Sequence, residues 1–116
     1  MQKSDRLENA KEMGTGVCGV YAIYLAHNPK VGYIGSAKCI RRRLMSHLAS
    51  LRRHAHKNYR LQALYRRHGE EPFRYTILEE SKTAAIARQR EQKLIDFTQP
   101  ELLYNLDKQV YKYKKD

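Results

Sequence analysis

Apolar and β-branched side chains dominate residues 17–25, VCGVYAIYL, a composition typical of a buried β-strand. Alternate positions along a strand share one face, which here would hold Val17, Gly19, Tyr21, Ile23 and Leu25. Residues 27–30 have turn chemistry, because proline disfavours a helical conformation in the residue before it. Residues 31–35 then predict a second strand, antiparallel to the first.

The period of the apolar positions changes near Ile40. Apolar residues recur there at helical spacing, at Ile40, Leu44, Leu48 and Leu51. They predict a helix with arginines around its remaining surface. A second helix is predicted from about Asn58, a suitable N-cap, to His68, with Gly69 ending it.

A third strand follows Pro72, where Phe73, Tyr75 and Ile77 alternate with polar residues. A last helix is predicted to begin near Thr83 and to end before Pro100. The elements therefore follow in the order ββααβα. We expect an α+β domain in which helices flank a three-stranded antiparallel sheet.

The length and composition fit one folded domain. A chain of 116 residues can bury a modest core, and 41% hydrophobic residues is ordinary for a globular protein. No apolar run approaches the ~18 residues of a membrane span, and the polar start of the chain does not resemble a signal peptide. Cys18 and Cys39 lack CxxC spacing and are too few for a disulfide scaffold. We expect a cytoplasmic protein without a membrane partner.

Positive charge is concentrated in one block of the chain. The formal net charge is +11, and residues 13–69 hold eleven Lys or Arg and no acidic residue. Such a one-sided block attracts a polyanion, of which nucleic acid is the commonest. The alternative is a solvated basic surface that serves solubility alone.

Glu91 is the first candidate for chemistry, because it falls on the apolar stripe of the last helix with Ala87 and Leu94. A lone carboxylate in that position costs several kcal/mol unless it is paired or binds a cation. The alternatives are an ion pair with Arg88 or Arg90, or a stripe displaced by one position.

Arg43 and His47 lie four residues apart and are therefore neighbours on one helix. A guanidinium fork and an imidazole together can bind and protonate a phosphate. A solvated helix face is the alternative. Zinc is disfavoured, because the histidines and cysteines show no CxxC or HxxxH pair.

Tyr21 and Tyr33 are placed to face each other across the predicted hairpin. Two phenols beside a phosphate could orient or deprotonate a water, although an ordinary aromatic core is the plainer explanation from the sequence. Gly19 and Gly35 weaken their strands, so each indicates a close approach of backbone or a tight path of the chain.

Taken together, these residues resemble the GIY-YIG nuclease domain, and most closely that of the phage-type homing endonucleases. Its two motifs stand here as Gly19-Val20-Tyr21 and Tyr33-Ile34-Gly35, with valine replacing isoleucine in the first. The remaining family positions fall, in order, on Arg43, His47, His56, Glu91 and Asn105. The match spans residues 17–107, with 1–16 as an N-terminal extension and 108–116 as a basic C-terminal tail.

The resemblance implies a ββααβα fold and Mg²⁺-dependent hydrolysis of DNA phosphodiesters, with Mn²⁺ as an alternative ion. Glu91 would hold a single metal ion, since one carboxylate supports one hard cation. Arg43 would stabilise the phosphate, and Asn105 would orient the groups around the metal.

The resemblance also implies roles for the remaining polar residues. We assign Tyr21 as general base on the attacking water, with Tyr33 and His47 orienting the water and the phosphate. His56 would hold a flanking phosphate. The residues expected to contact DNA are Lys38, Arg41, Arg42, Arg52, Arg53, His56 and Lys57.

Four questions remain open at this point. The extensions at either end are too short for a DNA-recognition domain, so we expect a catalytic fragment or a free-standing nuclease of low sequence specificity. A monomer would nick DNA, and a dimer would be needed to cut both strands. The tail VYKYKKD would either extend the DNA contact or remain a solvated end. The alternative function is a basic DNA-binding module that does not cleave.

Overall fold

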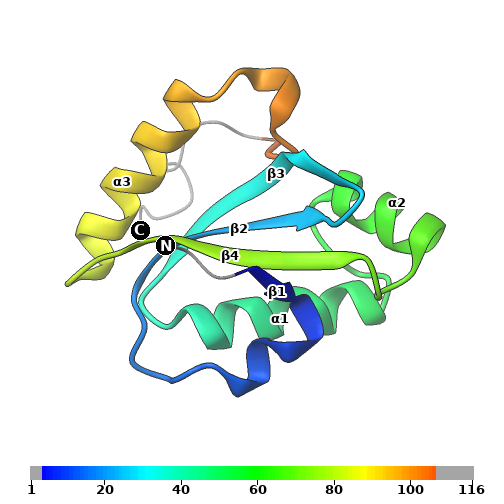
Figure 1. The fold of residues 1–116 in the computed structure, drawn as a ribbon, viewed down its shortest axis with the longest axis horizontal. Coiled ribbons are helices and arrows are strands. Elements are labelled where there is room, and N and C mark those ends of the chain that lie inside the picture. The colour runs from blue at the N-terminus through cyan, green and yellow to red at the C-terminus, as the bar shows by residue number, and fades with distance from the viewer. Residues whose placement is uncertain (1–3, 107–116) are drawn as a thin grey trace.

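The structure is a computed structural model that describes residues 4–106 of the chain (Figure 1). Its elements are β1 (Ser4–Arg6), the 3-10 helix η1 (Leu7–Glu12), β2 (Gly19–Leu25), β3 (Asn28–Ala37), α1 (Ile40–Arg52), α2 (Tyr59–His68), β4 (Phe73–Glu80), α3 (Ala84–Phe97) and the 3-10 helix η2 (Pro100–Leu102). From β2 to α3 the predicted ββααβα order is confirmed. The basic tail predicted at 108–116 lies outside the described residues.

The sheet has four antiparallel strands in the order β1-β4-β2-β3, so the prediction of three strands was too low. The additional strand is β1, in which Asp5 lies opposite Tyr75 of β4. The sequence Ser-Asp-Arg has no apolar alternation that would mark it as a strand. Its pairing instead completes the edge of β4, a tertiary effect that local pattern does not contain.

The hairpin of β2 and β3 is tighter than predicted. Strand β3 begins at Asn28 rather than Val31, and Pro29 lies within it. Proline is tolerated there because β3 is an edge strand, with no further strand of the sheet beside it. The register places Tyr21 opposite Gly35, so Tyr21 and Tyr33 are diagonal neighbours and not the direct pair expected.

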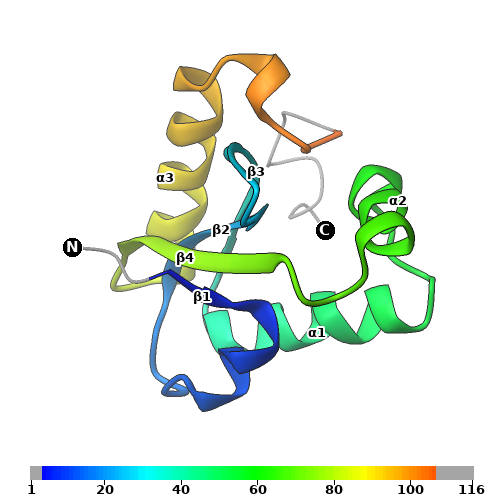
Figure 2. The same ribbon diagram turned by 45° about the vertical axis from the view of Figure 1, so that its right-hand side comes forward.

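Helices cover both faces of the sheet (Figure 2). Helix α1 and η1 pack on one face, and α3 packs on the other. The larger core, on the α1 face, includes Tyr21, Ile23, Leu25, Ile40, Leu44, Leu48, Leu51 and, from the N-terminal segment, Leu7 and Ala10. The smaller core, on the α3 face, holds Val20, Ile34, Ile95 and Leu103. Successive residues of β2 and β3 therefore serve opposite cores.

The helix ends follow the predicted capping chemistry. The Asn58 side chain accepts hydrogen bonds from the backbone N–H groups of Arg60 and Leu61, and Gly69 ends α2 with φ of 77°. After α1, His54 takes a left-handed conformation with φ of 56°, in the turn between α1 and α2. Both cysteines are free. Within residues 4–106, no helix is long and apolar enough to cross a membrane.

Candidate active site

A hollow of about 850 Å³ lies at the outer edge of β3. We call it the active-site hollow, and among its lining residues are Tyr33, Arg43, His47, His56, Glu91 and Asn105. Helix α1 contributes to it from one face of the sheet and α3 from the other. An edge strand permits this arrangement, because side chains from both faces can meet around it. The fold thus brings most of the predicted site residues together from distant parts of the sequence.

Glu91 is buried, with 7% of its surface exposed, and it reaches the active-site hollow from α3. It accepts a hydrogen bond from the hydroxyl of Ser36 on β3. The expected alternative partner Arg90 instead forms a two-pronged ion pair with Glu79, at 2.8 and 2.9 Å. Ser36 was missed from the sequence, although its alternation with Ile34 places it on the α3 side of β3.

Asn105 joins the C-terminal segment to the edge of β3. Its Oδ1 accepts from the Ile34 N–H and its Nδ2 donates to the Ile34 carbonyl, both at 2.9 Å. One residue before it, the Tyr104 N–H donates to the Gly32 carbonyl at 2.8 Å. The side-chain amide of Asn105 therefore pairs with β3 as the backbone of a neighbouring strand would. This contact fixes the position of Asn105 at the hollow.

Tyr21 is only 1% exposed and does not line the active-site hollow, but its hydroxyl contacts His47, which does. Its phenol crosses β3 at Gly35, where a Cβ atom would lie only 2.6 Å from Cζ of Tyr21. At Gly19, a Cβ atom would overlap the backbone carbonyl of Glu79. The close backbone approach predicted from the sequence is confirmed at Gly19, whereas at Gly35 the group that comes close is the side chain of Tyr21.

A chain of hydrogen bonds connects the start of α2 with Tyr21. The backbone N–H of Asn58 donates to Nδ1 of His56 at 3.0 Å, so this nitrogen carries no proton. In a neutral imidazole the proton then lies on Nε2 of His56, which donates to Nδ1 of His47 at 2.7 Å. By the same reasoning, Nε2 of His47 donates to the Tyr21 hydroxyl at 2.8 Å.

The surroundings keep both imidazoles neutral. Burial, aided by the nearby His56 and Arg43, lowers the pKa of His47 from 6.5 to about 3. Burial likewise lowers the pKa of His56, with Arg43 contributing. These shifts support the direction of the hydrogen bonds from Asn58 to Tyr21.

Burial, with Tyr33 adding to it, raises the pKa of the Tyr21 phenol well above its ordinary value. Arg43 opposes this shift by its charge and as a hydrogen-bond donor. The His47 N–H donates to the Tyr21 oxygen, and the nearby positive charge of Arg43 also favours the ionised form of the phenol.

The residues predicted to contact DNA divide into three groups. Arg53, His56 and Lys57 line the active-site hollow. Lys38 and Arg42 line a second hollow beside it, which also borders on Arg43. Arg41, which donates to the Lys11 carbonyl, and Arg52, which forms an ion pair with Glu70, line neither hollow.

The donor set around the active-site hollow suits a hard cation. Among residues 4–106 there is no group of three or more His, Cys, Asp or Glu that could hold a metal by protein ligands alone. Glu91 presents one carboxylate beside an open hollow, where water and phosphate oxygens can complete an octahedral shell. This arrangement fits Mg²⁺, which keeps much of its water when bound to proteins.

The sequence model of one protein family, described as the GIY-YIG catalytic domain, matches residues 17–105. The chain belongs to the GIY-YIG family. In this GIY-YIG domain, the segment that forms β1 and η1 precedes residue 17 and lies outside the family match. No curated protein matches the chain.

Two solved structures are similar to this GIY-YIG domain. One is the catalytic domain of the intron endonuclease I-TevI in a mutant form, with 27% identity and a TM-score of 0.71 over 80% of this chain and 96% of that one. The other, titled the catalytic domain of the homing endonuclease I-TevI, has 28% identity and a TM-score of 0.68 over 78% and 98%. The predicted family and its homing-endonuclease branch are confirmed.

Proposed function

We propose that this GIY-YIG domain is a divalent-metal-dependent endonuclease that hydrolyses DNA phosphodiester bonds. The observation that carries the proposal is the meeting of Glu91, Arg43 and the chain from His56 to Tyr21 around one hollow. Such a centre contains a cation ligand, a phosphate ligand and a group to take a proton. The similar solved structures are endonucleases by their titles, which supports the same reaction class.

Glu91 and Arg43 would bind the scissile phosphate. Glu91 would hold one Mg²⁺, or Mn²⁺ in its place, and a bound ion there would neutralise charge on the phosphate and on the leaving oxygen. The Arg43 guanidinium is exposed and lines the active-site hollow, so it can turn its N–H groups toward the non-bridging oxygens. Asn105 would keep the C-terminal segment in place beside them.

Tyr21 is our assignment for the group that takes the proton of the attacking water, which it would do as a tyrosinate after its own phenolic proton has passed to solvent. His47 is unsuited to that role, because its pKa of about 3 makes it a weak base and its Nε2 already carries a proton. Its N–H instead stabilises negative charge on the Tyr21 oxygen. Tyr33 lines the hollow and contacts the ring of His47, so it would help to orient the water beside the Tyr21 oxygen.

One such centre per chain supports nicking of one DNA strand by a monomer, with two copies needed for a double-strand cut. The test is incubation of the protein with supercoiled plasmid and Mg²⁺ or Mn²⁺. We expect nicking that stops with chelator and falls by about two orders of magnitude or more in Glu91→Gln, Arg43→Ala and Tyr21→Phe. Tyr33→Phe should reduce the rate less than Tyr21→Phe.

Arg67→Ala, at an exposed position of α2 away from both hollows, is the matched control for Arg43→Ala and should nick like the wild type. Salt-sensitive DNA binding without cleavage under either ion would instead support the non-catalytic alternative. Labelled single-stranded, duplex and branched oligonucleotides would then identify the preferred substrate. The cytoplasmic location stays a prediction from the sequence.

A further inference from the structure

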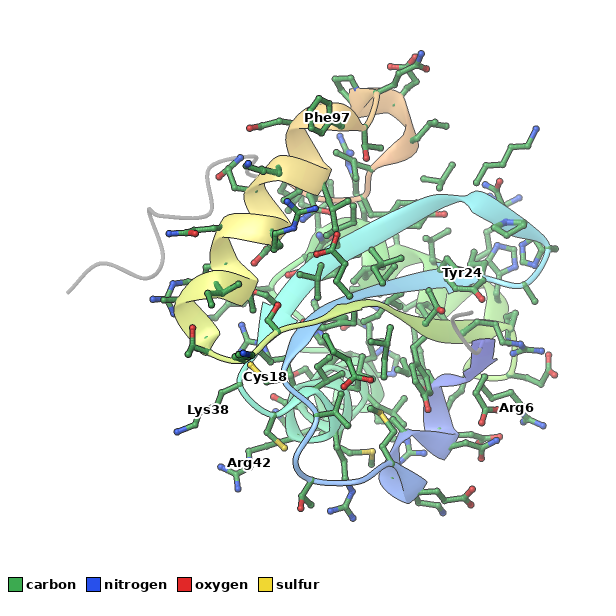
Figure 3. The ribbon with its side chains drawn as sticks, turned by 60° about the vertical axis from the view of Figure 1, so that its left-hand side comes forward. Arg6, Cys18, Tyr24, Lys38, Arg42 and Phe97 are labelled. Carbon is green, nitrogen blue, oxygen red and sulfur yellow. The ribbon has the colours of Figure 1, made fainter. Side chains whose placement is uncertain are left out.

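The second hollow, of about 1080 Å³, begins where the active-site hollow ends. We call it the flanking groove, and its basic lining residues are Lys38, Arg42, Arg43, Lys82 and Arg88. No acidic residue lines it within the described part of the chain. Figure 3 shows Lys38 and Arg42 extending from the end of the molecule where α3 begins, near Cys18, which also lines the groove.

The cations of the flanking groove lack acidic partners. Lys38, Arg42, Lys82 and Arg88 form no ion pair with any residue that the structure describes. Elsewhere arginines are paired, as in Arg90 with Glu79. Unpaired like charges gathered around one concavity repel each other, and an anion placed among them removes that repulsion.

The flanking groove and the active-site hollow share a boundary. Arg43 and Ser46 line both. Ser36 lines the flanking groove, and its hydroxyl binds the carboxylate of Glu91, which lines the active-site hollow. A strand that passes from one to the other must therefore cross Arg43 and Glu91.

We infer that the flanking groove binds the phosphodiester backbone of the strand being cut, on one side of the scissile phosphate. Arg53 and Lys57 of the active-site hollow would hold the backbone on the opposite side. This inference rests on the proposed function, and it adds Lys82 and Arg88 to the residues that contact nucleic acid. These two residues lie in the acid-rich part of the sequence, outside the basic block, so charge along the chain did not single them out.

The test compares two double variants that lose the same charge. Lys82→Ala/Arg88→Ala changes the flanking groove, whereas Lys30→Ala/Lys93→Ala changes an exposed hairpin residue and an exposed residue of α3 outside it. Binding of fluorescent DNA is measured by anisotropy over a salt series. We expect the groove variant to lose about tenfold or more in affinity and its salt slope to fall by about 2, with little change in the control.

Equal losses in the two double variants would overturn the inference, because net charge alone would then explain them. Lys82→Glu against Lys30→Glu repeats the comparison at exposed positions if the double variant folds poorly. Binding is measured without cleavage, so the two proposals can fail separately. If the groove variant alone loses affinity and the protein never nicks DNA, the flanking groove is supported and the nuclease proposal is contradicted. If the protein nicks DNA and both double variants lose affinity equally, the nuclease proposal is supported and the inference about the groove is contradicted.

Discussion

At the scale of single residues, the position of the Tyr21 phenol depends on the absence of a side chain at Gly35. The register of β2 and β3 sets them opposite, so the last glycine of the second motif makes room for the tyrosine of the first. The phenol crosses the strand there and meets Nε2 of His47 at 2.8 Å. The two motifs, separated in sequence by a hairpin, therefore form one structural unit.

Gly35→Ala should displace the Tyr21 phenol, because the added Cβ atom would lie 2.5 Å from its oxygen. We expect nicking to fall by about two orders of magnitude, as misplacement of a reacting group by an ångström can cause. Overpacking should also lower the free energy of unfolding by about 1 to 3 kcal/mol. Initial nicking rates and urea unfolding would measure the two effects.

Gly32→Ala is the matched control, since it lies on the same strand and its Cβ atom would come no closer than 3.4 Å to another group. It should nick like the wild type. A Gly35→Ala protein that is as active as Gly32→Ala would contradict the dependence of Tyr21 on Gly35.

At the scale of elements, β1 and η1 belong to the folded unit although the family match begins only at residue 17. Strand β1 completes the sheet beside β4, and η1 packs against α1. Leu7 and Ala10 are fully buried in the larger core. The segment predicted as an extension therefore supports the helix that carries Arg43 and His47.

Leu7→Ala should destabilise the domain by about 2 to 5 kcal/mol, because it removes a fully buried leucine and leaves a cavity under α1. Leu106→Ala, the same substitution at a residue that is 41% exposed, should cost far less. Chemical unfolding of both variants would measure the difference. Equal stability of the two would mean that the N-terminal segment packs only loosely.

At the scale of the whole molecule, the active-site hollow makes stability depend on pH. His47 is buried against Tyr21, Tyr33, His56 and Arg43, and its pKa in the folded protein is about 3. Above pH 6.5 the imidazole is neutral in the folded and unfolded states, so it does not change the free-energy difference between them. As the pH falls from 6.5 toward 3, only the unfolded state gains the proton, and the folded state loses relative stability.

Lowering the pH from 7.5 to 5 should therefore reduce the free energy of unfolding by about 2 kcal/mol through His47, with a further loss through His56. In His47→Gln, the loss over the same range should be smaller by about that amount. Urea unfolding at the two pH values would measure both. His27→Gln, at an exposed position, is the control and should keep the wild-type dependence. If stability depended on pH in His47→Gln as it does in the wild type, the conclusion that His47 is buried and neutral in the folded protein would be contradicted.

Several features of the fold and site could be predicted from local pattern because local physics decides them. The caps at Asn58 and Gly69 and the apolar stripe of α1 depend on neighbouring residues alone. Glu91 could be singled out because a carboxylate on an apolar stripe is costly wherever that stripe packs. The grouping of the site residues came from the resemblance to a family, since spacing alone left each one with a plainer explanation.

The sequence by itself determined the order of the elements from β2 to α3, the ends of α2 and the family of this protein. Tertiary structure alone decided that β1 pairs with β4 and that the Tyr21 phenol packs against Gly35. It also decided that the Ser36 hydroxyl binds Glu91 and that Lys82 and Arg88 line the same groove as Arg42. The physical reason is the range of the interactions involved. Caps and stripes act within a turn or two of chain, whereas strand edges, buried hydrogen bonds and clustered charges join segments that only the folded sheet brings together.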